Sequence, residues 1–444
     1  MDRRRFFKTS ALSLGAVAAN DVPVLGKKKV DLSTQRILEP QGWIEEPARR
    51  IPVADSADVV VVGGGPAGVA AALSAARQGC SVCLVERSGF LGGLWTGGLV
   101  LIVWCVTGHN RQGKDEQVIF GAVSEIVERL QKLGMVDDPK QPTPDPEAAK
   151  YVMAELLEEA GVKVLYHSVG AGLMKSGDRI DSLLLETKSG RIAIRGKMFV
   201  DATGDGDLME WAQEDYYEIK YQIGLNYLLG NMDSVNKEAE GFQKQWTGLP
   251  TPVPSVNWVN VIGPKEQDAL DVFNTSRLQY QLRKEAWENT EALKKKPGYE
   301  NVFLQLTAPL LGCRAARILN SRHNITLEES MTYASFSDAI GMSGAWTDVP
   351  YNGGVVPKDK RPYWQIPLSS LVPKKTQNLL VAGRCFGFER GLLEDAREIG
   401  TCFVTGQGAG AAAAQAVLQR TNPADLDIKK LHAALKSLNV RYEM

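Results

Sequence analysis

The sequence has few of the residues that build metal centres or disulfide frameworks. Its 444 residues include four histidines and six cysteines, with no histidine pair at i, i+4 and no Cys/His cluster, which argues against a zinc or iron–sulfur site. Cys80 and Cys83 have C-x-x-C spacing, but they lie at a hydrophobic run, Ser81–Val85. We therefore expect buried strand cysteines here, with a redox or bridging pair as the alternative, and no metal.

An excess of charge of either sign is also missing. The formal net charge is −1, so nothing suggests a nucleic-acid partner or binding to an anionic membrane surface. The composition, 44% hydrophobic and 23% charged, is that of an ordinary globular protein, and a chain of this length should divide into two lobes. The 43 glycines are clustered, which indicates tight turns and close backbone approach to a ligand.

Residues 1–19 have the pattern of an export signal. Arg3 and Arg4 are followed by a variable residue, Phe6, Phe7 and Lys8, and then by an uncharged run of small and apolar residues that is too short to span a bilayer. The stretch resembles a bacterial twin-arginine signal, which an exporter recognises and which carries folded cofactor proteins. We expect a periplasmic or exported protein, or a membrane-tethered one if the signal stays uncleaved. The alternative is a frayed basic tail.

Residues 20–56 are polar and read as a linker, with one additional strand expected near Arg50–Val53. A nucleotide-binding unit follows. The β-branched run Asp58–Val62 predicts a buried parallel strand, Val69–Gln78 a helix, and Ser81–Val85 a second strand that ends at Glu86. Between the first strand and the helix lie the glycines of a G-x-G-x-x-G motif, namely Gly63, Gly65 and Gly68.

Each glycine of the motif has a physical role in dinucleotide binding. Gly63 permits the tight turn, Gly65 lets the backbone approach the pyrophosphate, and Gly68 allows close packing of helix and strand. The start of the helix at Pro66 and Ala67 offers N–H groups and a positive dipole to the phosphates. Glu86 is placed to accept hydrogen bonds from the adenosine ribose.

The segment after Glu86 favours FAD over NAD. Arg87 is followed by a glycine-rich loop that contains Gly92 and Gly93, and such a loop leads the chain past the pyrophosphate in FAD enzymes of the glutathione-reductase type. Residues Gly406–Ala411 imitate a second fingerprint, but no strand and acidic residue follow. We interpret them as a small-residue helix packed close to the cofactor.

Two later segments are expected to complete the FAD site. Phe199–Asp207 predicts a strand end with a glycine-rich acidic turn, and Asn378–Arg384 predicts another buried strand, before a helix over Thr401–Leu418. The positive end of that helix dipole would stabilise a reduced, anionic flavin. The residues expected at the cofactor from these segments are Thr203, Gly204, Asp205, Gly383, Arg384, Gly400 and Gln407.

Several stretches together resemble a known family. They read ADVVVVGGGPAGVAAALSAARQG, PEAAKYVMAELLEEAGVKVLYH, FVDATGDGDL, GCRAARILNSRHNITLEES and IPLSSLVPKKTQNLLVAGR. The chain resembles the FAD-dependent oxidoreductase family typified by exported bacterial flavoproteins and, more distantly, fumarate-reductase-type and thiazole-synthase-type flavoproteins. It departs from the family pattern at Glu394-Asp395-Ala396-Arg397 and at Gly400-Thr401-Cys402, which suggests a different substrate or proton donor.

The predicted fold is α/β: a two-dinucleotide-binding-type FAD domain with a Rossmann-like parallel sheet and an inserted α+β substrate lobe. We expect the FAD domain over residues 57–209 and 363–444, and the substrate or cap lobe over 210–362, where amphipathic helices such as Ser276–Lys296 begin. The aromatic residues of this region form either a packed interface or a platform for a cyclic substrate; they are Trp346, Tyr351, Tyr363 and Trp364.

Flavin chemistry needs a positioned substrate, one acid or base, and cations near the group it polarises. Arg397, with Glu394 and Asp395, is the first catalytic candidate, because it precedes the helix expected to reach the flavin; a surface salt-bridge network is the alternative. His109 is the second, with a covalent flavin link through it as a further possibility. Arg314 is a third, in substrate binding or a salt bridge. Asp348, Arg390, Arg317 and His323 are weaker candidates.

The predicted function is oxidation or reduction of a small hydroxylated or unsaturated molecule, a carbohydrate among them, by hydride transfer to or from FAD. The alternative is an accessory flavoprotein that carries electrons for another redox protein. No haem motif or iron–sulfur cysteines accompany the fold, which favours the enzyme. The sequence does not identify the electron acceptor.

Overall fold

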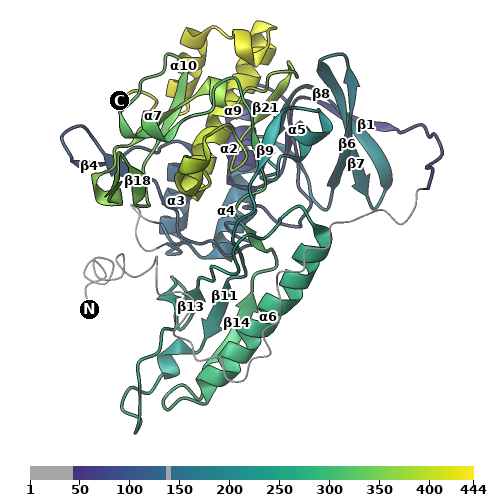
Figure 1. Ribbon diagram of the computed structural model, residues 1–444. Coiled ribbons are helices and arrows are strands. Elements are labelled where there is room, and N and C mark those ends of the chain that lie inside the picture. The colour runs from purple at the N-terminus through teal and green to yellow at the C-terminus, as the bar shows by residue number, and fades with distance from the viewer. Residues whose placement is uncertain (1–43, 137–141) are drawn as a thin grey trace. The chain divides into compact units, whose positions relative to one another are not determined.

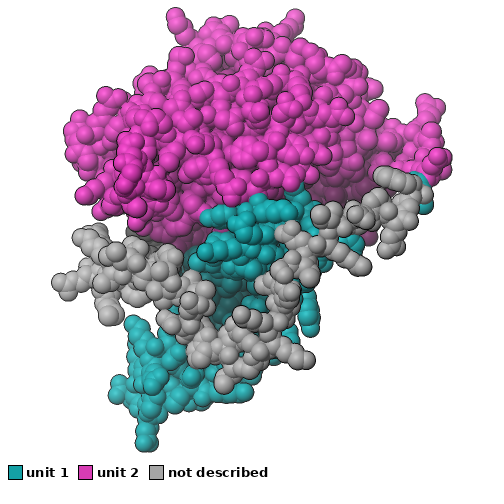
Figure 2. All heavy atoms as spheres, viewed as in Figure 1, with its two compact units in different colours: residues 1–44, 220–313 teal, residues 45–219, 314–444 magenta. Residues whose placement is uncertain are grey.

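The computed structural model describes residues 44–136 and 142–444. The chain forms two compact units, drawn in different colours in Figure 2. The smaller is built from residues 220–313, and the larger from residues 45–219 and 314–444. The inserted unit therefore begins and ends inside the span 210–362 expected for the substrate lobe, and residues 314–362 belong to the larger unit.

The predicted signal, residues 1–19, and the linker up to residue 43 lie outside the described residues. From Val53 the chain is already a strand, so the additional strand expected near Arg50–Val53 is the beginning of the first sheet strand, β1 (Val53–Val62). Over the part of the chain that the structure describes, no helix is both long and apolar enough to cross a membrane.

A seven-stranded sheet forms the centre of the larger unit (Figure 1). Its strand order is β5-β2-β1-β8-β7-β6, and β21 also pairs with β8. The strands β1, β2, β5, β8 and β21 are mutually parallel neighbours, whereas β6, β7 and β8 form an antiparallel meander. Their bounds are β2 Val82–Val85, β5 Lys163–Leu165, β6 Val169–Ser176, β7 Arg179–Thr187, β8 Gly190–Asp201 and β21 Leu379–Val381.

The predicted parallel Rossmann-like sheet is thus confirmed. Val59–Val61 of β1 are fully buried, as are Cys83 and Leu84 of β2, which explains why both strands are continuous hydrophobic runs instead of alternating ones. Cys80 and Cys83 are buried and unbridged.

Two helices pack closely against each other over the sheet. They are α2 (Pro66–Arg77) and α9 (Ile399–Gln419). A Cβ on Gly406 would lie 2.1 Å from the Ala67 carbonyl oxygen, and one on Gly410 would lie 2.1 Å from that of Ala71. The glycines of the 406–411 segment therefore permit close helix–helix contact, and the segment is helical as predicted.

The larger unit is completed by two further helices, α3 (Ala122–Lys132) and α4 (Pro146–Glu159), and by shorter elements. The latter are β3 Thr107–His109, β4 Asp115–Gln117, α5 Asp207–Trp211, β9 Tyr216–Glu218, β16 Arg317–Leu319, α7 Leu327–Met331, β17 Ala339–Ser343, β18 Val349–Tyr351, β19 Gly354–Val356, β20 Trp364–Pro367, α8 Leu393–Ala396, α10 Ile428–Ser437, and the 3-10 turns η2 Lys358–Lys360, η3 Leu368–Ser370, η4 Arg390–Leu392 and η5 Pro423–Asp425.

The smaller unit has its own core and is of the α+β type. An antiparallel sheet in the order β12-β13-β11-β14 packs against α6 (Val272–Lys294), whose N-terminus is capped by the Asp271 carboxylate. The strands are short: β10 Ile223–Gly224, β11 Tyr227–Gly230, β12 Leu249–Pro250, β13 Asn257–Val259, β14 Phe303–Thr307 and β15 Gly312–Cys313, with a 3-10 turn η1 at Met232–Ser234.

Candidate functional site

The loops predicted to hold the cofactor meet at one edge of the sheet. Strands β1, β2, β8 and β21 are parallel and end at Val62, Val85, Asp201 and Val381. The glycine motif, Glu86, the turn at Thr203 and Gly383 follow these ends directly. Parallel strands expose their carboxyl ends at the same edge, where open α/β sheets bind nucleotides. The structure therefore brings together residues that lie far apart in the sequence.

Of the three glycines in the motif, the fold requires Gly63 and Gly68 but does not require Gly65. Gly63 has φ +101°, and a Cβ there would lie 2.4 Å from the Ala202 carbonyl oxygen. A Cβ on Gly68 would lie 1.7 Å from the Gly63 carbonyl oxygen. A Cβ on Gly65 would meet only the Gly93 Cα, at 3.9 Å. The absence of a side chain at Gly65 therefore leaves open space in front of the turn, as a pyrophosphate requires.

The start of α2 fits the same ligand. Gly65 is the N-cap residue, Pro66 occupies the first turn next to Ala67, and no side chain caps the helix. The N–H groups of this turn are therefore available to an anion, and the helix dipole favours one there. The loop with Gly92 and Gly93 closes over the turn, since the Gly92 N–H donates to the Gly64 carbonyl at 2.7 Å.

Glu86 is buried and fixes the edge of the site. Its Oε2 accepts from the Gly64 N–H at 2.7 Å and its Oε1 from the Ser88 N–H at 2.6 Å. A carboxylate has about four lone-pair sites, so each oxygen can accept a further hydrogen bond from a ribose hydroxyl. Glu86 thus holds the glycine turn and the following loop together while remaining a fitting ribose partner.

The turn after β8 is organised by a buried carboxylate. Asp201 Oδ1 accepts from the Thr203 N–H at 3.1 Å and from its hydroxyl at 2.7 Å, and Oδ2 accepts from the Met209 N–H at 3.0 Å. Gly204, at φ +78°, follows, and Asp205 forms an ion pair with Arg384, two residues after Ala382 in the loop after β21. The ion pair joins the loops after β8 and β21.

Charges from three loops converge on Asp207. The pKa of its carboxyl is raised to about 6, because burial and the charges of Asp201 and Asp205 outweigh those of Arg317 and Arg87. Arg87, directly after Glu86, is therefore close enough to influence the turn after β8 electrostatically. The predicted cofactor residues Arg87, Asp205 and Arg384 share one charged environment.

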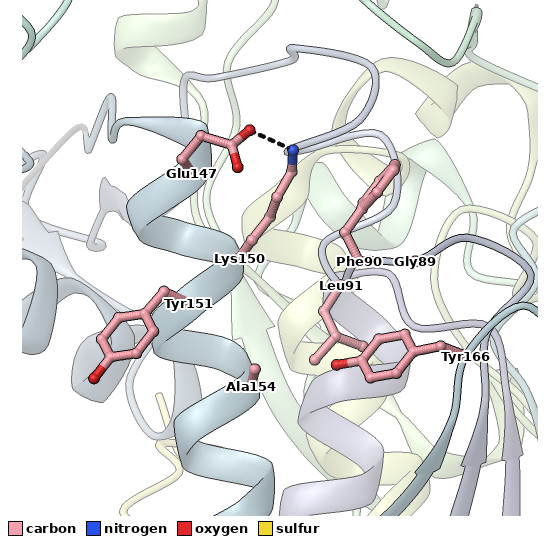
Figure 3. A pocket seen from close by; sticks show the side chains of 8 residues that line it. All are labelled: Gly89, Phe90, Leu91, Glu147, Lys150, Tyr151, Ala154 and Tyr166. Carbon is pink, nitrogen blue, oxygen red and sulfur yellow. Dashed lines mark hydrogen bonds and ion pairs between the residues drawn. The ribbon is translucent and has the colours of Figure 1, made fainter.

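A cavity of about 430 Å³ lies beside the loop after Glu86. Figure 3 shows its walls: Phe90 and Leu91 from that loop, α4, and Tyr166 after β5. Lys150 of α4 pairs with Glu147 at 2.6 Å, and its ammonium lies over the Phe90 ring, 4.6 Å from the centroid. The cavity is lined by aromatic rings and a neutralised cation.

The first catalytic candidate belongs to a buried cluster at the start of α9. Arg397 pairs with Glu394, one turn earlier, and its Nη1 lies 3.1 Å from the Glu398 Oε1. Its guanidinium carbon lies 5.9 Å from the centroid of the Trp346 ring, which in turn stacks on Trp104 at 5.3 Å. The Arg397 side chain is 11% exposed. Two carboxylates and an indole therefore hold this guanidinium in place.

Asp395 has a different partner from the one expected. It is 1% exposed, and its Oδ2 lies 2.6 Å from Nη1 of Arg361, a fully buried arginine, while its Oδ1 accepts from the Trp346 N–H at 3.1 Å. Both carboxylate oxygens are thus engaged away from Arg397. This arrangement favours a role for Asp395 in holding the segment, although burial raises the pKa of its carboxyl.

Glu398, the N-cap residue of α9, was not a sequence candidate. It is 4% exposed. The pKa of its carboxyl is raised to about 7, because burial and the carboxylates of Glu394 and Asp395 outweigh the opposing charges of Arg397 and Arg314. Arg314, the third catalytic candidate, therefore lies within electrostatic reach of Glu398. A carboxyl with such a pKa can exchange a proton near neutral pH.

Cys402, in the first turn of α9, connects this cluster to the cofactor loops. The pKa of its thiol is raised to about 12, because burial and the charge of Glu398 outweigh the charges of Arg384 and Arg397. Its Sγ also lies 3.5 Å from the Arg397 carbonyl oxygen. Thr405, one turn further along α9, accepts from the Gly383 N–H, so the Arg397 cluster and the loop after β21 meet the same end of this helix.

Other predicted residues have mainly packing roles in the structure. The Gln407 amide binds the backbone at the start of α3: its Oε1 accepts from the Ala122 N–H at 2.5 Å, and its Nε2 donates to the Phe120 carbonyl at 3.1 Å. A Cβ on Gly400 would lie 2.4 Å from the Trp104 carbonyl oxygen. Gly383 donates its N–H to the Thr405 hydroxyl at 3.0 Å, which joins the β21 loop to α9.

His109 ends strand β3, on the segment that also carries Trp104. Its carbonyl oxygen accepts from the Tyr363 N–H and from the Tyr333 hydroxyl, both at 3.1 Å. Two residues before Tyr363 lies Arg361, so the backbone of His109 is tied to the segment that carries the partner of Asp395. His109 stays the second catalytic candidate.

The weaker candidates are held in local contacts. His323 Nε2 lies 3.0 Å from a Glu329 oxygen, Asp348 accepts from the Lys358 N–H at 2.8 Å, and Arg317 lies 3.5 Å from Asp207. The aromatic residues of the expected group make separate contacts: Tyr363 and Trp364 are buried, Trp346 stacks on Trp104, and Tyr351 donates to Glu328 at 2.5 Å.

The family model described as FAD dependent oxidoreductase matches residues 58–224 and 220–435. The chain belongs to the FAD-dependent oxidoreductase family. It is thus an enzyme with FAD as its cofactor, and the open turn at Gly65, the uncapped start of α2 and Glu86 fit that cofactor.

A thiamine thiazole synthase of Methanococcus vannielii is 30% identical over 158 residues, which are 33% of this chain and 56% of that protein. The chain therefore spans little more than half the length of this relative. Among solved structures, a geranylgeranyl bacteriochlorophyll reductase-like protein of Thermoplasma acidophilum has a TM-score of 0.44 and 13% identity, over 87% of this chain and 84% of that one. A p-nitrophenol 4-monooxygenase of Pseudomonas putida has a TM-score of 0.40 and 12% identity, over 87% of this chain and 83% of that one.

Proposed function

We propose that this FAD-dependent oxidoreductase oxidises or reduces a small hydroxylated or unsaturated molecule, of which a carbohydrate is one example, and that the Arg397 cluster is its substrate-binding and proton-transfer site. When bound, FAD supplies the two-electron acceptor or donor for a hydride at its N5 position. The observation that carries the proposal is the hydrogen bond from the Gly383 N–H to the Thr405 hydroxyl at 3.0 Å, which ties α9, the helix that follows Arg397, to the cofactor loop after β21.

The residues of the cluster have separable tasks. Arg397 binds a carboxylate or developing oxyanion of the substrate, because a guanidinium offers two parallel N–H donors to such a group. Arg314 adds positive charge. The buried Arg361–Asp395 pair holds the segment that carries Arg397, and His109 is the second candidate for acid–base catalysis.

A second function class is an electron-carrying flavoprotein that serves another redox protein. The buried cluster favours the enzyme, because a carrier needs no substrate-binding arginine held between two carboxylates. The alternative would use the same cofactor loops and leave the Arg397 cluster as a structural joint.

Anaerobic bleaching of the flavin distinguishes the two classes. We expect that one class of small molecule from a panel of polyols, sugars, hydroxy acids and enoates reduces the bound FAD, or reoxidises the reduced form, at a rate that depends on its concentration. Loss of flavin absorbance near about 450 nm, the usual flavin band, is the readout. Reduction only by a partner protein, with no response across the panel, would support the carrier.

We further propose that the protein is exported with its FAD already bound. The support is the Arg3-Arg4 pattern of the predicted signal, which lies outside the described residues. Replacing both arginines by lysine should leave the full-length, flavin-loaded protein in the cytoplasm, because the paired guanidiniums are what the exporter recognises. Cell fractionation with flavin fluorescence measures this, and Lys27→Arg with Lys28→Arg is a charge-neutral control. Unchanged export of the double-lysine variant through the same route would refute the signal.

A further inference from the structure

The Arg397 cluster contains a buried carboxyl, that of Glu398, which shares its arginine with a second carboxylate. Glu398 shares Arg397 with Glu394, so one guanidinium faces two carboxylates, at 3.1 Å in the case of Glu398. Asp395, the third carboxylate of the segment, is neutralised by Arg361. Of the pair that shares Arg397, the Glu394 side chain is 30% exposed, whereas Glu398 is 4% exposed. The buried member is the one whose charge is least well solvated.

The Glu398 side chain does not cap α9, although Glu398 occupies the N-cap position of that helix. It is the N-cap residue of α9, yet its side chain accepts no hydrogen bond from the first turn of the helix. N-cap carboxylates usually serve this purpose and are thereby kept ionised. Its carboxylate lies instead against Arg397, and its charge reaches the Cys402 thiol, which also responds to Arg384 of the cofactor loops.

We infer that Glu398 takes up a proton when the bound FAD is reduced and releases it when the FAD is reoxidised. A substrate that is oxidised loses two electrons and two protons. The hydride, which is both electrons with one proton, goes to FAD, and the Glu398 carboxylate takes the other proton. In the reverse direction Glu398 returns that proton to the substrate. The inference rests on the proposed hydride chemistry for its catalytic meaning, but the redox-linked protonation needs no substrate to be observed.

The charges around Glu398 give the sign and the pH window. Arg397, Glu394 and Asp395 face it from the α8 segment, Arg314 from the segment that precedes β16, and the Cys402 and Cys105 thiols from α9 and from the loop before β3. Burial and the carboxylates of Glu394 and Asp395, against Arg397 and Arg314, raise the pKa of Glu398 to about 7. Reduction adds negative charge to the neighbouring site, which raises the pKa further. Glu398 therefore gains a proton on reduction only above about pH 7.

Potentiometric titration of the FAD-loaded full-length protein tests the inference without substrate. Between about pH 7 and pH 8 the wild type should take up one proton more per two electrons than Glu398→Gln. For a two-electron couple one proton is a tenfold change in the equilibrium constant per pH unit, so its midpoint potential should fall about 30 mV per pH unit more steeply. Below about pH 6 the two slopes should converge, because Glu398 is then protonated in both redox states.

Two further variants distinguish the effect of removing a negative charge beside Arg397 from the effect of removing the group that takes up the proton. Glu394→Gln removes the same charge from the same arginine and should shift the potential without removing the additional proton. Glu398→Asp keeps a titratable group and should restore the steeper slope. Equal slopes for the wild type and Glu398→Gln above pH 7, or loss of the extra proton in Glu394→Gln alone, would overturn the inference.

Infrared spectroscopy keeps the inference testable if Glu398→Gln does not bind FAD. The reduced-minus-oxidised difference spectrum of the wild type at pH 8 should contain a new protonated-carboxyl band, absent at pH 6. Its absence at pH 8 also overturns the inference. A failed substrate panel together with a confirmed additional proton would refute the proposed substrate chemistry and leave the protonation site standing.

Discussion

Replacing Arg397 by alanine should slow reduction of the flavin by substrate about thirty- to a thousand-fold while FAD stays bound. The expected loss of two to four kcal/mol of transition-state stabilisation, about the value of one well-placed charged donor, gives this range. Arg397→Lys should recover part of the rate, because it keeps the charge but not the paired N–H donors. Rapid-mixing measurements per bound flavin give the rate, and Arg195→Ala, which changes an exposed arginine of β8, is the matched control.

The stability of the same variant has a predicted pH dependence. The folded-state pKa of Glu398 is raised to about 7 from the ordinary 4.5, so its burial destabilises the fold increasingly as pH rises from 4.5 towards 7. Without Arg397 the pKa rises further, and the destabilisation continues to grow above pH 7. The melting temperature of Arg397→Ala should therefore lie closer to that of the wild type at pH 6 than at pH 8.

A purely structural Arg397 predicts another outcome. In that case the alanine variant melts several degrees lower at every pH, yet its folded, FAD-loaded fraction turns over at the wild-type rate. The Arg397 cluster would then be a joint between segments, and His109 would become the leading catalytic candidate.

The cofactor edge could be predicted from the sequence because its signals are local. The strand, the glycines, the helix and Glu86 follow each other within one β-α-β unit, and parallel pairing with β8 and β21 then brings Thr203 and Gly383 to the same edge. Neither step depends on the detailed packing of side chains. The spacing of Gly63, Gly65 and Gly68 alone distinguishes the glycines that face protein from the one that faces open space.

The Arg397 cluster could be predicted only in part, because its pairing is a matter of tertiary packing. The Glu394-Asp395-Arg397 run suggested one network, whereas Asp395 turns to Arg361, which no local pattern connects to it. Glu398 was adjacent in sequence to a named candidate, but its importance comes from burial, and burial at a helix N-cap is not visible in a lone glutamate. Gln407 shows the converse, since a residue in a glycine-rich run turned out to hold the start of α3.

The second and third glycines of the nucleotide motif, Gly65 and Gly68, should differ in how an alanine substitution changes the stability of the apo protein. Gly65→Ala should leave the apo protein nearly as stable as the wild type, because Gly65 has φ −72° and its new Cβ would meet only the Gly93 Cα at 3.9 Å. Gly68→Ala should destabilise the apo protein strongly, because its Cβ would lie 1.7 Å from the Gly63 carbonyl oxygen and the turn itself must move.

Affinity for FAD should follow from the same geometry. In Gly65→Ala the methyl group enters the open space in front of the turn, and overpacking of about 1–3 kcal/mol corresponds to roughly a five- to 150-fold weaker complex. Fluorescence-quenching titration of acid-stripped protein with FAD gives the dissociation constant, and thermal melting of both apo variants supplies the stability. Wild-type affinity in a stable Gly65→Ala protein would mean that the pyrophosphate does not approach this glycine, whereas equal melting of the two variants would show that Gly68 is not required by the turn. Together the pair of variants separates what the fold demands of this motif from what the cofactor demands of it.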